Sequence, residues 1–188
     1  MKKKKILIVD DKKENIDAAK VAIARAGLLR VAYASSTKEA IDTIITAYET
    51  DKTFFDLVIS DLEMEKSSSG IEVAVKSAKY LAIPFIATER NGAPGFKYGE
   101  GHGPNTSIEP IKKGFHGKKF DPNIWEQIFH GIEEVCLKPP YKQILESLGS
   151  YKKFVGKPSD EIGKLILVSF DHYLYFNWPE IYKEMQGK

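Results

Sequence analysis

The chain has 188 residues and a formal net charge of +2, so its size suits one domain with a small appendage, and its charge gives no reason to expect nucleic-acid binding. Its single cysteine, Cys136, excludes an internal disulfide. No apolar run approaches the ~20 residues of a membrane span, and the lysine-rich start lacks the apolar stretch of about 7–15 residues found in secretory leaders. We therefore expect a cytoplasmic protein without a membrane partner.

The first part of the chain alternates between short apolar runs and segments of helical period. Residues 6–9 are a continuous apolar run, which is typical of a strand covered on both faces. Apolar residues at helical spacing predict a helix over residues 16–26, and Gly27 follows as a stop signal. Residues 28–34 predict the second strand.

The alternation continues along the next part of the chain. Ser36 and Glu39 form a capping box, which predicts the start of a second helix. Strands are predicted over residues 54–60 and 83–88, with a helix over residues 70–80 between them. Strand–helix units joined by short connections predict an α/β fold, namely a doubly wound parallel sheet with helices on both faces.

Polar side chains stand at the ends of the predicted strands. Asp10 and Asp11 follow the first strand, Asp61 follows the third, and Thr88 ends the fourth. Ligand sites in such sheets lie at the carboxyl ends of the strands, so we expect these side chains to meet in one crevice. Neighbouring carboxylates repel one another, and a cation would relieve that repulsion. Mg²⁺ binds through carboxylates and bridges to phosphate oxygens, and a carboxylate beside it can act as a nucleophile toward phosphorus.

The regular pattern breaks after the fourth strand. Residues 91–114 are rich in glycine and proline and show no helical period, so we expect a loop that serves as a lid or as a partner-binding segment. Asp121 as N-cap and Pro122 at the first helical position predict another helix. For residues 138–188 we expect a helical extension, and this segment carries no recognition-helix pattern for DNA.

These residues resemble the receiver domain of two-component response regulators. In that family an acidic pair ends the first strand, where this chain has Asp10 and Asp11. The phosphoacceptor ends the third strand, where Asp61 stands, and the residue two positions later offers its backbone carbonyl to the metal, which here is Glu63. A serine or threonine ends the fourth strand, and Thr88 occupies that position.

The family also has a lysine shortly before its last helix. The stretch GKKFDPNIWEQI is similar, with Lys118 in the lysine position and Lys119 where proline is usual. Lys113 and Lys119 are the alternatives for the same role. Phe115, three residues before Lys118, matches the position of the aromatic residue that takes part in the family's conformational switch.

The resemblance covers about residues 4–137, and it implies that residues 1–137 form a flavodoxin-like domain with a five-stranded parallel sheet. The chain departs from the family near the expected site. Glu65 stands where proline is usual, and Gly70 comes one residue later than the family's glycine. Glu89 stands where a small residue usually leaves the phosphate accessible. The glycine-rich segment takes the place of the fourth helix, so the oligomeric state stays open.

The resemblance implies a phosphoacceptor rather than an enzyme, with at most self-phosphorylation and autodephosphorylation. Asp61 would accept a phosphoryl group from a histidine kinase or a phosphotransfer protein. Asp11 and Asp61 would bind Mg²⁺ directly, Asp10 would assist through water, and Thr88 and Lys118 would hold the phosphoryl oxygens. The alternative is a pseudo-receiver that keeps the fold and acts as a protein-interaction module. A Mg²⁺-dependent phosphatase would need a second acid two residues after the first, where this chain has a lysine.

Overall fold

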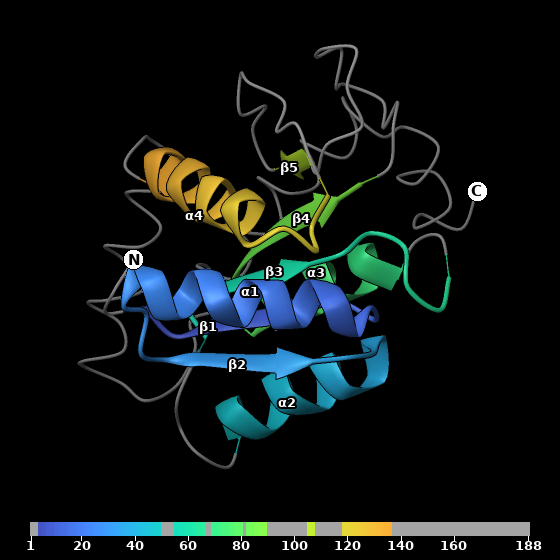
Figure 1. Ribbon diagram of the computed structural model, residues 1–188. Helices are drawn as coiled ribbons and strands as arrows, with labels where there is room; N and C mark the ends of the chain where they lie inside the picture. Colours follow the sequence, from blue (N-terminus) through green and yellow to red (C-terminus); the bar gives the residue numbers. More distant parts are fainter. Residues whose placement is uncertain are drawn as a thin grey trace.

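The computed structural model describes residues 4–49, 55–66, 69–80, 82–89, 105–107 and 118–136. Within these residues, one sheet has the strand order β2-β1-β3-β4-β5, and helices cover both of its faces (Figure 1). The strands are β1 (Ile6–Val9), β2 (Val31–Ala34), β3 (Leu57–Ser60), β4 (Ile83–Thr88) and β5 (Asn105–Ser107). The helices are α1 (Lys13–Ala26), α2 (Thr37–Glu49), α3 (Ser69–Lys79) and α4 (Pro122–Cys136).

Four strands of the sheet are parallel, and the fifth is not. The pairs β1–β2, β1–β3 and β3–β4 run parallel, which confirms the predicted parallel α/β sheet for these strands. The expectation of a fifth parallel strand is wrong, because β5 runs antiparallel to β4 with Asn105 opposite Thr88. To add a parallel strand, the chain must cross back to the end of the sheet where the previous strand began. To add an antiparallel strand, it only has to reverse direction where the previous strand stops. The chain therefore re-enters the sheet at the end where β4 stops.

The central strand β1 is buried on both faces. Ile6 and Ile8 belong to a hydrophobic core that also contains apolar residues of α1 and α4, which lie next to each other (Figure 1). Leu7 and Val9 belong to a second core, on the opposite face, with residues of α2. Successive side chains of a strand point to opposite faces, so a strand between two cores needs a continuous apolar run.

The helix ends follow the predicted signals with one change. α1 is capped at its C-terminus by Gly27, which has a left-handed φ of 64°. Glycine adopts this conformation easily because it has no Cβ. In the predicted capping box, the Ser36 hydroxyl accepts the Glu39 N–H at 3.1 Å. The Glu39 carboxylate, however, accepts from the N–H and hydroxyl of Ser35, at 2.7 and 2.8 Å, rather than from the N–H of Ser36.

The last described helix, α4, is amphipathic in the predicted register. Asp121 caps it by accepting the Asn123 N–H at 2.9 Å, and Pro122 is its first residue, which confirms the predicted start. Its buried apolar residues are Ile124, Trp125, Ile128, Phe129 and Ile132. These side chains contribute to the same core as α1 and thereby fix the segment before the helix against the sheet.

Several predicted features lie outside the described residues. They are Phe115, the extension over residues 138–188, and the loop over residues 91–114 apart from β5. Among the residues that the structure does describe, no helix has both the length and the apolar character needed to cross a membrane.

Candidate functional site

Three aspartates meet at the carboxyl ends of β1 and β3. Val9 pairs with Ser60 in the parallel register, so the next residues, Asp10 and Asp61, lie side by side. The Asp61 N–H donates to the Val9 carbonyl at 2.8 Å, which carries the pairing one residue further. One carboxylate oxygen from each of Asp10, Asp11 and Asp61 lies within 4.8 Å of the others. The structure thus brings together the three acids that the sequence predicted to converge.

Asp10 is the most completely hydrogen-bonded of the three acids. It is 1% exposed. Its Oδ1 accepts from the Lys12 N–H at 3.0 Å and from Asn15 Nδ2 at 3.0 Å, and its Oδ2 accepts from Asn15 Nδ2 at 3.1 Å. Asn15 was missed in the sequence analysis. The available signal was a polar residue on the inward face of the first turn of α1, because a buried amide requires a partner.

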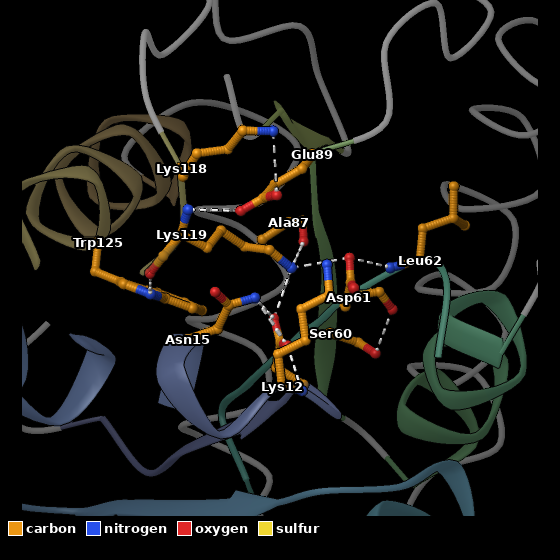
Figure 2. A network of polar contacts seen from close by, with 11 residues as sticks. Lys12, Asn15, Ser60, Asp61, Leu62, Ala87, Glu89, Lys118, Lys119 and Trp125 are labelled. Atoms are coloured by element: carbon orange, nitrogen blue, oxygen red, sulfur yellow. Dashed lines mark hydrogen bonds and ion pairs between the residues drawn. The ribbon is translucent and has the colours of Figure 1, made fainter. Parts of the chain in front are cut away.

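A buried lysine, Lys119, places its positive charge next to Asp61 (Figure 2). Its side chain is 1% exposed, and its Nζ lies 2.6 Å from Asp10 Oδ2 and 2.9 Å from Asp61 Oδ1. The third contact of Nζ is the Ala87 carbonyl at 3.0 Å. Nζ thus contacts three oxygen atoms, and an ammonium group has three donors. This arrangement offsets part of the cost of burying the charged groups.

The lysine that contacts the acidic cluster is Lys119, one of the alternatives named from the sequence, and not Lys118. The side chain of Lys118 is 46% exposed, and its Nζ lies 3.6 Å from Glu89 Oε2. Lys119 is held by its backbone, because Glu89 Oε1 accepts its N–H at 2.7 Å and Trp125 Nε1 donates to its carbonyl at 2.7 Å. In Figure 2 the Glu89 carboxylate lies between the two lysine side chains. These backbone contacts determine which lysine faces the acids.

Two donors approach the same carboxylate oxygen of Asp61. Oδ1 accepts from the Leu62 N–H at 2.9 Å and from Lys119 at 2.9 Å. Burial raises the pKa of Asp61, the Lys119 charge opposes that rise, and the neighbouring Asp10 charge adds to it. Neither of these two contacts involves the second oxygen, Oδ2.

The remaining predicted residues lie at the same edge of the sheet. Ser60 pairs with Ile86, so Ala87 and Thr88 continue β4 beside the acidic cluster. Thr88 is buried, and Glu63, two residues after Asp61, is exposed. The proposed use of the Thr88 hydroxyl and of the Glu63 carbonyl stays a prediction.

The loop after Asp61 packs closely against the first turn of α3. The Gly70 N–H donates to the Leu62 carbonyl at 2.9 Å. A Cβ on Gly70 would lie only 2.0 Å from the Asp61 carbonyl oxygen and 2.7 Å from the Leu62 Cα. Both contacts are with backbone atoms, which cannot move aside independently. This close approach explains why a glycine stands at this position.

Glu65, in the same loop, is bonded to the start of α2. Its carboxylate accepts from the Thr37 N–H at 2.9 Å and from the Thr37 hydroxyl at 2.6 Å. Hydrogen bonding to Thr37 is the main cause of the lowered pKa of Glu65. The sequence analysis identified Glu65 only as a departure from the family, because Thr37 is 28 residues away and no local pattern connects the two.

The donor set fits a hard divalent cation. All three contributing side chains are carboxylates, and Asp11 is exposed while Asp10 and Asp61 are buried. With every group ionised, the three acids and Lys119 leave a formal excess of two negative charges. Oxygen ligands with this charge suit Mg²⁺.

Residues 6–86 match the family model of the response regulator receiver domain. The matched range contains β1 to most of β4 and all three aspartates, and it ends before Thr88 and Lys119. No curated protein and no protein of solved structure matches the chain.

Replacing Lys119 should destabilise the fold far more than replacing its neighbour. We expect Lys119→Met to lower the free energy of unfolding by about 3–5 kcal/mol, because it leaves two buried carboxylates without their cation. Lys118→Met is the matched control and should change the value by about 0–1 kcal/mol. Urea denaturation of both variants at neutral pH provides the comparison. Equal effects of the two substitutions would contradict the assignment of Lys119.

Asp61→Asn should stabilise the protein increasingly as the pH rises. Because the pKa of Asp61 is raised in the folded state, its contribution to stability is fully present below the unfolded pKa and is lost as the pH rises through the folded pKa. The asparagine variant does not ionise and avoids this loss. The difference in unfolding free energy between variant and wild type, measured in urea from about pH 4 to 8, should therefore grow with pH. A constant difference would argue against a raised pKa.

Gly70→Ala should destabilise the protein by about 2–3 kcal/mol, because its Cβ would overlap the Asp61 carbonyl. The sign of the change in unfolding free energy is informative, because replacing glycine by alanine inside a helix otherwise stabilises a protein by about 1 kcal/mol. Glu72→Ala, at an exposed position of the same helix, is the control and should stay within about 0.5 kcal/mol of wild type. Thermal and urea unfolding measure both variants. An unchanged or more stable Gly70→Ala protein would show that the loop is not tightly packed.

Proposed function

We propose, from the match of residues 6–86 to the response regulator receiver domain and from the geometry of the aspartate cluster, that Asp61 accepts a phosphoryl group in the presence of Mg²⁺. The donor is a histidine kinase or a histidine phosphotransfer protein. We further propose that residues 1–137 form the receiver-like unit, that residues 138–188 form a C-terminal extension, and that the protein works in the cytoplasm.

One observation carries the proposal most directly. Asp61 is a buried carboxylate with one oxygen fixed by the Leu62 N–H and by Lys119, and a second oxygen that neither donor engages. A nucleophile must be held in one orientation and still present a free lone pair. The neighbouring Asp10 and Asp11 add the negative charge that a divalent cation needs.

The proposed transfer follows from these contacts. A carboxylate oxygen of Asp61 attacks the phosphorus of a phosphohistidine. The new P–O bond forms as the P–N bond breaks, and the imidazole nitrogen leaves with the bonding electron pair and takes up a proton. Asp11, Asp61 and the Glu63 carbonyl would hold Mg²⁺, with Asp10 assisting through water, and the cation would supply positive charge beside the phosphoryl oxygens.

Lys119 takes the role that the sequence analysis gave to Lys118. Its Nζ lies 2.9 Å from Asp61 Oδ1, so its positive charge is placed next to the incoming phosphoryl group. The Thr88 hydroxyl is proposed to hold another phosphoryl oxygen. Phosphorylation would require Lys119 to exchange a carboxylate partner for a phosphoryl oxygen, and this exchange is the proposed origin of a conformational signal.

The same lysine also favours a second candidate function. Lys119 already gives Asp10 and Asp61 a cation, at 2.6 and 2.9 Å. Lys119 offsets one of the three negative charges of the cluster, which reduces the need for a metal. In this reading the domain is a pseudo-receiver that binds protein partners and is not phosphorylated. Mg²⁺ affinity separates the two functions, because only the phosphoacceptor requires it.

The decisive experiment is the intact mass of the protein after incubation with acetyl phosphate and Mg²⁺. We expect a gain of about 80 Da, the mass of one phosphoryl group, which is lost in Asp61→Asn and in the presence of a chelator. Lys118→Met, which changes the exposed lysine next to Lys119, should retain the gain in mass. No gain together with no measurable Mg²⁺ binding would overturn the phosphoacceptor and support the pseudo-receiver.

A further inference from the structure

Glu65 connects the phosphoacceptor loop to two helices. Its Oε1 accepts the Thr37 N–H at 2.9 Å, and its Oε2 accepts the Thr37 hydroxyl at 2.6 Å. The same Oε2 accepts the Ser69 hydroxyl at 3.2 Å. Thr37 is the first residue of α2 and Ser69 is the first residue of α3. One carboxylate therefore joins the loop after β3 to the beginnings of both helices.

The segment between Asp61 and Glu65 is fixed at both of its ends. At the first end, Leu62 donates its N–H to Asp61 Oδ1 at 2.9 Å, and its carbonyl accepts the Gly70 N–H at 2.9 Å. At the second end stands the carboxylate of Glu65. Glu63 lies between these two anchors, so the course of its backbone depends on both. Loss of the second anchor would leave the first anchor in place, together with Met64, which packs against the second core and donates its N–H to the Lys66 carbonyl at 3.3 Å.

We propose that Glu65 is a positioning residue for cation binding at the aspartate cluster, and that it couples occupancy of this cluster to the N-terminus of α2. The proposal rests on the proposed function, because it assumes that the cluster binds Mg²⁺. Coupling of this kind is reciprocal. If the bond between Glu65 and Thr37 strengthens Mg²⁺ binding, then Mg²⁺ binding strengthens that bond by the same factor.

A general electrostatic effect must be separated from positioning. Removing any acidic residue near the cluster weakens the attraction for a cation. Glu72 provides the matched control, since it is an exposed acid in the first turn of α3, and its removal changes the net charge by the same amount. A difference between Glu65→Ala and Glu72→Ala then reports the hydrogen bonds of Glu65.

The first measurement is the affinity of the full chain for Mg²⁺ alone, by isothermal titration calorimetry. We expect Glu65→Ala to weaken binding about 10-fold, the usual scale for residues that orient metal ligands from outside the coordination sphere. Glu72→Ala should stay within about twofold of wild type. Equal losses in the two variants would overturn the proposal.

Thr37→Val provides a second test that keeps the charge of Glu65. Valine removes the hydroxyl bond of 2.6 Å and retains the backbone N–H bond. We expect a smaller loss of Mg²⁺ affinity than in Glu65→Ala, and no further loss when both substitutions are combined, because they remove the same contact. Additive losses would overturn the proposal. Thr37→Val also replaces Glu65→Ala as the test variant if the latter fails to fold.

Amide hydrogen exchange of the peptide that contains Thr37 measures the coupling itself. In wild type and in Glu72→Ala, Mg²⁺ should slow exchange in this peptide. In Glu65→Ala, Mg²⁺ should leave the exchange rate unchanged. A merely structural role of Glu65 would speed exchange in the variant and still leave the response to Mg²⁺ intact, and that result would overturn the coupling.

The failure of this proposal differs from the failure of the proposed function. If wild type binds Mg²⁺ and gains a phosphoryl group on Asp61, while Glu65→Ala and Glu72→Ala behave alike, only the role of Glu65 is overturned. If wild type neither binds Mg²⁺ nor gains the phosphoryl mass, the phosphoacceptor function is overturned and the role of Glu65 falls with it.

Discussion

The site depends on one buried ammonium group. The parallel register of β1 and β3 places Asp10 and Asp61 side by side at the strand ends, where both carboxylates are buried. Two such charges repel strongly away from water, and Lys119 relieves this by lying within 2.9 Å of each. Because Lys119 lies three residues before the first residue of α4, its contacts with the acids also position the start of that helix. The packing of α4 and the geometry of the site are therefore linked.

The backbone of Lys119 is fixed by residues whose roles are not visible in a motif. Glu89, at the end of β4, accepts its N–H, and Trp125, in the first turn of α4, donates to its carbonyl. Glu89 stands where receivers usually have a small residue, and here it acts as a structural acceptor that also faces Lys118 at 3.6 Å. An extra acid near an acidic site is thus tolerated, because its charge is directed at the lysine segment.

The loops around the cluster are held by contacts between distant parts of the chain. Gly70 allows α3 to approach the backbone of Asp61 and Leu62, and Glu65 bonds the same loop to Thr37 at the start of α2. The antiparallel β5 returns the chain to the edge where Thr88 lies. Each of these features brings another segment to the carboxyl ends of the strands. The carboxyl ends of the strands are therefore held by more contacts than the strand pattern alone predicts.

The amino-acid sequence by itself determined the parallel α/β sheet of the first four strands, most helix boundaries, and the convergence of Asp10, Asp11 and Asp61, because apolar periodicity, capping residues and strand ends are local signals. Tertiary structure alone decided which of two adjacent lysines turns inward, since that choice rests on Glu89, 30 residues away. It also decided the direction of β5, because strand direction depends on which end of the sheet the chain returns to.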